Sequence, residues 1–116
     1  MPQVICIGSA SKDIFFPTGE GVFIETPEDL TSKEKVMFEV GAKYQVEDRY
    51  EAVGGVAANS AQGLARLGIK TACYSHLGED QIGKWVTEEL QKENVDISLL
   101  EHDREAQTDL SAILVF

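Results

Sequence analysis

Apolar residues along the chain fall into short runs that alternate with amphipathic stretches. The run Val4–Gly8 is rich in β-branched residues and ends in glycine, which predicts a buried, parallel, central strand. Gly55–Leu67 and a segment starting near Asp80 repeat their apolar residues at helical spacing. Ile69–Leu77, between these two segments, is predicted as the next strand. A succession of strand, helix, strand and helix indicates an α/β fold with a mainly parallel sheet.

Residues that commonly end helices support these boundaries. Gly68 stands where a glycine usually terminates a helix, and Asp80 is a suitable N-cap for the second helix, which we expect to end near Asn94. Two further apolar runs, Ile97–Leu100 and Leu110–Phe116, are strand candidates.

Residues 14–51 interrupt the α/β pattern. Prolines and glycines recur there among scattered acidic residues, and the short apolar runs 21–24 and 36–40 have the character of strands. We expect a small antiparallel excursion between turns. The chain also stops within an apolar strand at Phe116, which leads us to expect the N-terminal piece of a longer protein.

Composition narrows the possible functions. The 116 residues form one domain at most, and the net charge of −10 argues against a nucleic-acid surface or an anionic membrane. No apolar run is long enough to span a bilayer, and the N-terminus lacks the pattern of a signal peptide. Cys6 and Cys73 lie in apolar runs and are expected to be reduced core residues of a cytoplasmic protein, and they could be neighbours on adjacent strands.

A candidate small-molecule site combines four residues. Asp13 ends the polar stretch Ser9–Asp13, which we expect to be a loop at the edge of the sheet where α/β proteins bind ligands. Its carboxylate could bond nearby backbone amides or accept hydrogen bonds from sugar hydroxyls. Gly54 and Gly55 could form a simple tight turn, or could let a ligand approach the main chain. Asn59 is either a helix-start amide or a ligand contact.

Other familiar motifs are missing from the chain. GGVAANSA lacks the lysine of a Walker A loop, and GSASKD lacks the glycines of a dinucleotide fingerprint. His76 and His102 have no serine or carboxylate at a telling spacing, so structural or surface roles are expected for both.

Taken together, three segments resemble the PfkB family of carbohydrate kinases, which are ribokinase-like. VICIGSASKD is similar to the family's first strand and substrate-binding aspartate. GGVAANSAQGLARLG is similar to its first signature, and SHLGEDQIGKWVTEELQKENVD continues the pattern. Val56 and Ser11 stand where many ribokinases carry lysine and asparagine, so ribose itself is not implied.

The resemblance implies an ATP-dependent kinase acting on a hydroxyl of a sugar, sugar phosphate or nucleoside, with Mg²⁺ as a further cofactor. Its fold would be ribokinase-like (Rossmann-like), with a mainly parallel sheet, helices and a small antiparallel β lid formed by residues 14–51 and 108–116. Asp13, Gly54, Gly55 and Asn59 would bind substrate, and a homodimer could form through the lid. The family's catalytic aspartate and anion hole have no counterpart in residues 1–116, which we therefore expect to be inactive alone.

Two other functions remain open. One is a Rossmann-like nucleotide-binding domain of an oxidoreductase, although such a domain would have a glycine loop directly after Val4–Gly8. The other is a non-catalytic α/β module that acts through dimerisation.

Overall fold

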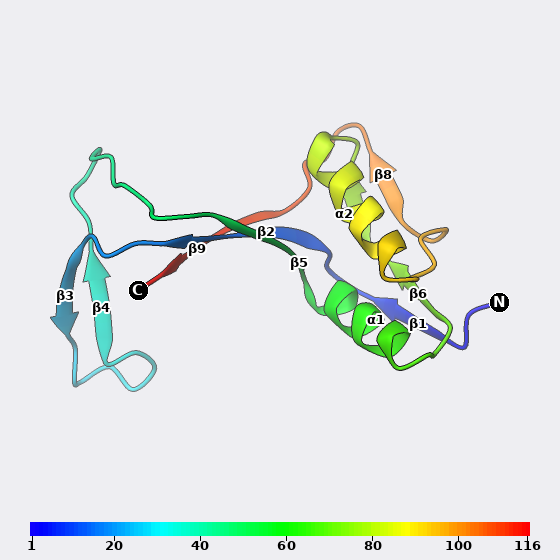
Figure 1. The fold of residues 1–116 in the computed structure, drawn as a ribbon, viewed down its shortest axis with the longest axis horizontal. Coiled ribbons are helices and arrows are strands. Elements are labelled where there is room, and N and C mark those ends of the chain that lie inside the picture. The colour runs from blue at the N-terminus through cyan, green and yellow to red at the C-terminus, as the bar shows by residue number, and fades with distance from the viewer.

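A computed structural model describes residues 1–116. Two helices and nine strands follow one another along the chain (Figure 1). Their bounds are β1 (Val4–Ile7), β2 (Ser11–Pro17), β3 (Val22–Glu25), β4 (Glu34–Met37), β5 (Tyr50–Gly54), α1 (Val56–Arg66), β6 (Thr71–Tyr74), β7 (His76–Gly78), α2 (Gln81–Lys92), β8 (Glu101–Asp103) and β9 (Leu110–Val115).

One half of the molecule is an α/β layer that contains the core. Strands β1 and β6 pair in parallel, α1 packs on both, and β7 pairs in parallel with β8 beside α2. The core consists mainly of small and aliphatic side chains, including Ala58, Ala61, Leu77, Val86 and Leu90. Small residues on α1 allow the helix to lie close to the strands, as the sequence predicts.

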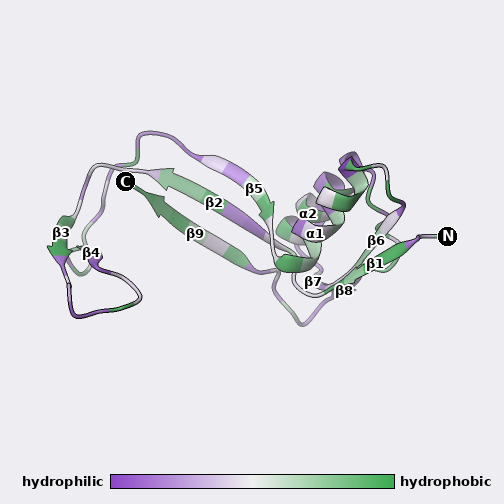
Figure 2. Cartoon of the chain, turned by 90° about the horizontal axis from the view of Figure 1, so that it is seen from below, coloured by the Kyte–Doolittle hydropathy of each residue, from purple (hydrophilic) through white to green (hydrophobic).

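The other half is a three-stranded sheet that projects from this layer. Its central strand, β2, pairs antiparallel with β5 and parallel with β9, and the β3–β4 hairpin lies beyond its far end (Figures 1 and 2). The molecule is therefore elongated, with extents of 51 × 31 × 25 Å. The antiparallel excursion predicted within residues 14–51 is confirmed by the β2–β5 and β3–β4 pairs.

Local sequence signals set the helix ends as predicted. Gly55 is the N-cap of α1, and Gly68 follows the helix with a φ of 83° that favours glycine. Asp80 caps α2 by accepting a hydrogen bond from the Gly83 amide at 2.7 Å. Asn94 follows α2 in the left-handed region, with a φ of 61°.

The two cysteines are neighbours, as the sequence allows. Cys6 and Cys73 are register partners on β1 and β6, and both are free thiols. Burial raises the pKa of the Cys73 thiol to about 11, with a further contribution from Cys6. Cys73 is fully buried, whereas Cys6 is only partly buried.

Three predicted elements differ from those in the structure: one loop and two strands. Ser11–Asp13 is not a loop but the start of β2, because β5 and β9 pair with it on either side. Ile69–Leu77 contains two strands, β6 and β7, that pair with different partners. Ile97–Leu100 closes a turn through the Leu100 amide and the Ile97 carbonyl at 3.1 Å, and the strand lies at β8 instead.

Strand β1 is also less enclosed than its sequence predicts. It pairs only with β6, and its alternate residues Ile5 and Ile7 are 49% and 75% exposed. A continuous apolar run is typical of a strand covered on both faces, but here only one face of β1 is covered by α1.

Candidate functional site

The candidate site lies where the three-stranded sheet meets the start of α1. The loop between β1 and β2 brings Ser9 to this junction. Its hydroxyl accepts a hydrogen bond from the Val56 amide at 3.1 Å, and its carbonyl accepts from Ala57 and Ala58 at 3.1 and 3.3 Å. Ser9 therefore occupies the first amides of α1, which in an open helix N-terminus would be available to an anion.

The paired glycines allow two close backbone approaches at this junction. Gly55 has a φ of 93°, and a side chain there would collide with the Ser9 carbonyl. Gly54 is buried at the end of β5, and a Cβ on it would overlap the Asp13 carboxylate. Gly55 therefore requires glycine, whereas a side chain at position 54 would require the Asp13 carboxylate to shift.

Asp13 lies within β2 and is half-buried. The Ser11 hydroxyl donates to its Oδ1 at 3.5 Å, and its register partners are Ala52 on β5 and Ser111 on β9. The neighbouring Lys12 points to the opposite face, where its Nζ lies 4.5 Å from the Trp85 ring of α2 and 3.3 Å from Glu51. Asp13 consequently faces away from α2.

Asn59 is exposed in the first part of α1, and its backbone N–H donates to the Gly55 carbonyl at 2.9 Å. The structure thus places Asp13 against Gly54 and the Ser9 carbonyl against Gly55, and Asn59 lies one turn further along the helix. Sequence reasoning missed Ser9. Its partner Val56 lies 47 residues away, so no local pattern could have identified the cap.

A second polar cluster joins α2 to the start of β9. Asp80 Oδ1 accepts from the Thr108 hydroxyl at 2.8 Å, and its Oδ2 accepts from the Thr108 amide at 2.8 Å. The buried Thr108 hydroxyl also accepts from the Gly78 amide at 2.9 Å. Backbone hydrogen bonds from Thr108 and Gly83 lower the pKa of Asp80. Asp80, between Gly78 and Gly83, is therefore a structural anchor.

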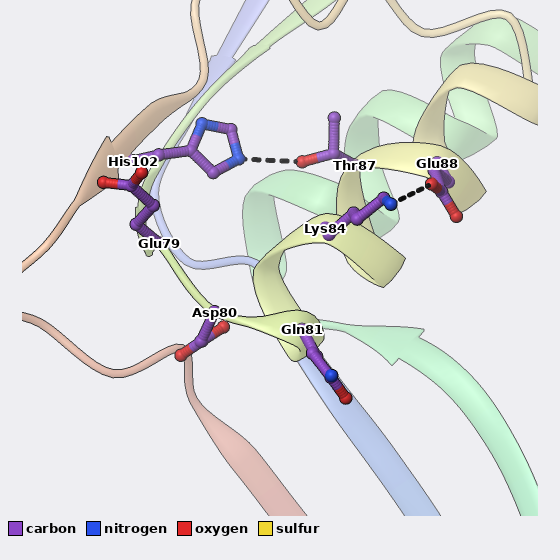
Figure 3. A pocket seen from close by; sticks show the side chains of 7 residues that line it. All are labelled: Glu79, Asp80, Gln81, Lys84, Thr87, Glu88 and His102. Carbon is purple, nitrogen blue, oxygen red and sulfur yellow. Dashed lines mark hydrogen bonds and ion pairs between the residues drawn. The ribbon is translucent and has the colours of Figure 1, made fainter.

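A polar groove lies beside this anchor (Figure 3). His102 Nε2 and the Thr87 hydroxyl approach to 3.0 Å across it, and Lys84 pairs with Glu88 at 3.9 Å. Its lining contains both charges and no hydrophobic residue: Glu79, Asp80, Gln81, Lys84, Thr87, Glu88 and His102. An open groove without apolar walls lacks the usual character of a small-molecule pocket.

His76 is not isolated, contrary to the sequence-based expectation. Strand pairing brings it between Asp103, at 3.0 Å from Nε2, and Glu101, at 3.4 Å from Nδ1. These two carboxylates raise the pKa of His76, Asp103 most strongly. The cluster is exposed and distant in sequence from the candidate site, and a structural role remains the expectation for this histidine.

The amides at the starts of both helices have partners within the chain. The first amides of α1 are taken by Ser9, the Gly83 amide of α2 is taken by Asp80, and no group of three metal-ligating side chains is present. No helix is long and apolar enough to cross a membrane.

The fold and this junction define an α/β protein of the ribokinase-like class, and comparison with known proteins agrees. Residues 22–115 match the model of the pfkB family carbohydrate kinases. The chain belongs to this family, as its sequence predicts.

Similar proteins of this family are kinases. The chain is 40% identical over 60 residues to the 2-dehydro-3-deoxygluconokinase of Bacillus subtilis, a match that covers 52% of this chain and 18% of that protein. It resembles a sugar kinase of Pyrococcus horikoshii solved with ATP, with 27% identity, a TM-score of 0.67, and coverage of 97% of this chain and 30% of the other. The ribokinase of Arabidopsis thaliana, solved with ribose and ATP, gives a TM-score of 0.75 at 23% identity, covering 97% and 32%. The chain thus spans less than a fifth of the curated relatives and about a third of the solved structures.

Proposed function

We propose that the chain is the substrate-binding part of an ATP-dependent kinase that phosphorylates a hydroxyl of a sugar, sugar phosphate or nucleoside. The observation that carries this proposal is the contact between Asp13 and Gly54 beside the start of α1, in a chain of the pfkB family. A carboxylate beside a glycine offers strong hydrogen-bond acceptors, and the missing side chain leaves room for a hydroxyl-bearing ligand.

Each site residue has a distinct role in this proposal. Asp13 accepts hydrogen bonds from substrate hydroxyls, and Asn59 contributes a further amide contact. Gly54 and Gly55 keep the junction open and act as the hinge between the sheet and the α/β layer. Ser9 holds the first turn of α1 in place, which makes it a positioning residue.

The projecting sheet would act as a lid over the substrate. Residues 14–51 and 108–116 contribute all of β3, β4 and β9, the larger part of β2 and the first two residues of β5 to this part of the molecule. Closure of such a lid would exclude water, which competes with the acceptor hydroxyl for the transferred phosphoryl group. The same lid, with its exposed hairpin, could pair with a second copy to form a homodimer.

The family resemblance implies ATP and Mg²⁺, and the similar sugar kinase solved with ATP supports the use of ATP. Bound Mg²⁺–ATP would supply the phosphoryl group and neutralise its charge. The family's catalytic aspartate and anion hole have no counterpart in the sequence of residues 1–116, so we expect these residues to bind substrate without transferring phosphate. We place the protein in the cytoplasm because both cysteines are free.

Calorimetric titration of the chain with neutral sugars and nucleosides tests the substrate site. Asp13→Asn should weaken binding by at least about tenfold, because the replacement loses a charged acceptor. The exposed Asp109→Asn variant is the matched control and should bind normally. Equal affinity of the two variants would refute the role of Asp13.

Activity is tested separately, by measuring ATP consumption with the same compounds. The 116-residue chain should consume none, whereas the product of the coding region extended beyond Phe116 should phosphorylate its substrate. A stop codon directly after Phe116 would contradict the kinase proposal and favour the dimerising module.

A further inference from the structure

We infer that Lys12 is a positioning residue that fixes the start of β2, and with it Asp13, relative to the α/β layer. The Lys12 ammonium group is held between Trp85 of α2 and Glu51 of β5. This inference rests on the proposed function, in which Asp13 binds substrate. Successive residues of a strand project to opposite faces, so Lys12 acts through the backbone of β2 and does not contact the ligand.

The three-stranded sheet meets the α/β layer at its base, where α1 packs on β5 and α2 packs on both β2 and β5 (Figure 2). On the α1 side, the chain passes through Gly54 and Gly55, which as glycines allow a wide range of backbone angles. On the α2 side, Asp80 and Thr108 fix the chain just before β9. Lys12 extends from β2 itself to α2, so its contact restrains the central strand of the sheet.

The Lys12 ammonium group is enclosed by two partners. Its Nζ lies 4.5 Å from the centroid of the Trp85 ring and 3.3 Å from Glu51 Oε1, and the Lys12 side chain is only 15% exposed. A lysine shielded to this degree needs partners for its charge, and cation–π attraction becomes stronger as water is excluded. Lys12 therefore ties β2 to α2 more firmly than an exposed lysine would.

The backbone of β2 transmits this restraint to Asp13. Asp13 is the next residue in the chain, and at both positions β2 is paired with β5 on one side and with β9 on the other. Ladder hydrogen bonds on both edges hold the two residues in one segment. Asn59, the other proposed side-chain contact to substrate, belongs to α1 in the α/β layer. The contact of Lys12 with α2 therefore sets the position of Asp13 relative to Asn59, and a substrate held by both residues binds best when this contact is intact.

Three variants separate this positioning role from a purely stabilising one. Lys12→Met keeps a long side chain and removes the charge, whereas Lys12→Arg keeps a cation that can stack on an indole ring. Lys92→Met on α2 is the matched control. Lys92 pairs with Glu89 at 2.8 Å and its side chain is 70% exposed, so this variant also removes an ion-paired lysine but leaves the junction intact.

Two measurements test the inference without a ligand. Trp85 is the only tryptophan of the chain, so its fluorescence reports on the contact directly. Lys12→Met should shift the emission maximum, and Lys12→Arg should bring it back toward that of the unchanged chain. Residual dipolar couplings of the backbone amides measure the orientation of the sheet relative to the α/β layer, which should change in Lys12→Met and not in Lys92→Met. Unchanged emission or unchanged orientation in Lys12→Met would overturn the inference.

A second variant covers the case in which Lys12→Met does not fold. Trp85→Phe keeps an aromatic ring at the junction but attracts a cation more weakly, so the dipolar couplings should report a changed orientation here too. Circular dichroism and urea denaturation establish which variants are folded. An orientation equal to that of the unchanged chain would overturn the inference.

Calorimetric titration with fructose, gluconate and adenosine connects the contact to binding. Lys12→Met should weaken each detectable interaction by about tenfold, whereas Lys12→Arg and Lys92→Met should bind as the unchanged chain does. Equal affinity of Lys12→Met and the unchanged chain would overturn the inference and leave the proposed function standing. If the unchanged chain binds none of the three compounds, the proposed function fails, and the fluorescence and the dipolar couplings still decide whether Lys12 orients the sheet.

Discussion

The contact between Asp13 and Gly54 couples the chemistry of the site to the backbone of β5. Because the carboxylate lies directly beside Gly54, a methyl group at this position would force the Asp13 side chain to move. We expect Gly54→Ala to lower the free energy of unfolding by about 1–3 kcal/mol through overpacking, and to displace Asp13. Urea denaturation measures the stability loss, and sugar titration measures the weaker binding.

Gly63→Ala is the control for this substitution. Gly63 lies on the exposed side of α1, and a Cβ there meets nothing within 4 Å. Alanine should therefore stabilise the helix by up to about 1 kcal/mol and leave binding unchanged. If both alanine variants had the same stability, steric contact with Asp13 would not be the reason for glycine at position 54.

His76 makes the free energy of unfolding of the chain depend on pH near neutrality. Asp103 and Glu101 raise its pKa in the folded state above the ordinary value of 6.5. Protonated His76 therefore stabilises the fold below that ordinary value, and this contribution is lost as the pH rises through the higher folded pKa. Asp103, whose pKa is lowered, loses its own contribution only under acidic conditions.

We expect the free energy of unfolding to fall between about pH 6 and 8 relative to that of His76→Gln, which cannot titrate. The change should be small because all three side chains are exposed. Urea denaturation of both proteins across this range measures the difference, and NMR titration of the ring measures the pKa directly. A folded pKa at or below 6.5 would contradict the ion-pair geometry.

At the level of elements, the Asp80–Thr108 cluster fixes β9 to the N-terminus of α2. One carboxylate oxygen of Asp80 accepts from the Thr108 amide, and the other accepts from the Gly83 amide and the Thr108 hydroxyl. Asparagine would replace one of these oxygens with an NH₂ donor, so the hydrogen bonds to that atom would be lost. We expect Asp80→Asn to destabilise the fold by about 1.5–3 kcal/mol. Hydrogen exchange should become faster in β9 and remain slow in β6, which is paired elsewhere.

Thr108→Val and Asp109→Asn complete this experiment. The valine variant keeps the shape of Thr108 and removes its hydroxyl. Its effect on the free energy of unfolding should therefore not add to that of Asp80→Asn. The exposed Asp109→Asn should change neither stability nor exchange. Additive effects of Asp80→Asn and Thr108→Val would show that the two side chains act independently.

The elements that the sequence predicted well are those with local signals. The spacing of apolar residues and the caps Gly68 and Asp80 identified both helices, since helix formation depends on residues a few positions apart. The division of Ile69–Leu77 into β6 and β7 depends on strand partners elsewhere in the chain, and no local pattern carries that information.

Prediction of the candidate site from the sequence was limited in the same way, to residues with local signals. Asp13, Gly54 and Gly55 could be selected because carboxylates and glycines have strong individual preferences, and the structure brings these three together. Ser9 and Thr108 could not be selected in this way, because their roles come from distant hydrogen-bond partners. Ser9 bonds Val56, which is 47 positions away, and Thr108 bonds Asp80, which is 28 positions away. Residue types indicated where chemistry was expected, whereas tertiary contacts determine which side chains hold that region in place.

At the scale of the molecule, elongation leaves apolar surface exposed. The radius of gyration is 17.4 Å, compared with about 13 Å for a compact chain of similar length. Phe116 packs edge-on against Phe23 of the hairpin at 5.4 Å between ring centroids. Val22 and Met37, register partners on the hairpin's other face, remain 57% and 53% exposed. This face is suited to contact a second copy of the chain.

We therefore expect the chain to self-associate, with a sedimentation coefficient that rises with concentration. Val22→Glu introduces a charge into the hairpin's exposed face and should keep the protein monomeric. Leu67→Glu, at the far end of α1 and 78% exposed, adds the same charge elsewhere and should associate normally. If the unchanged chain sediments as a monomer at every concentration, the homodimer proposal fails. If both variants lose association equally, net charge and not the hairpin controls it, since the chain already carries a charge of −10.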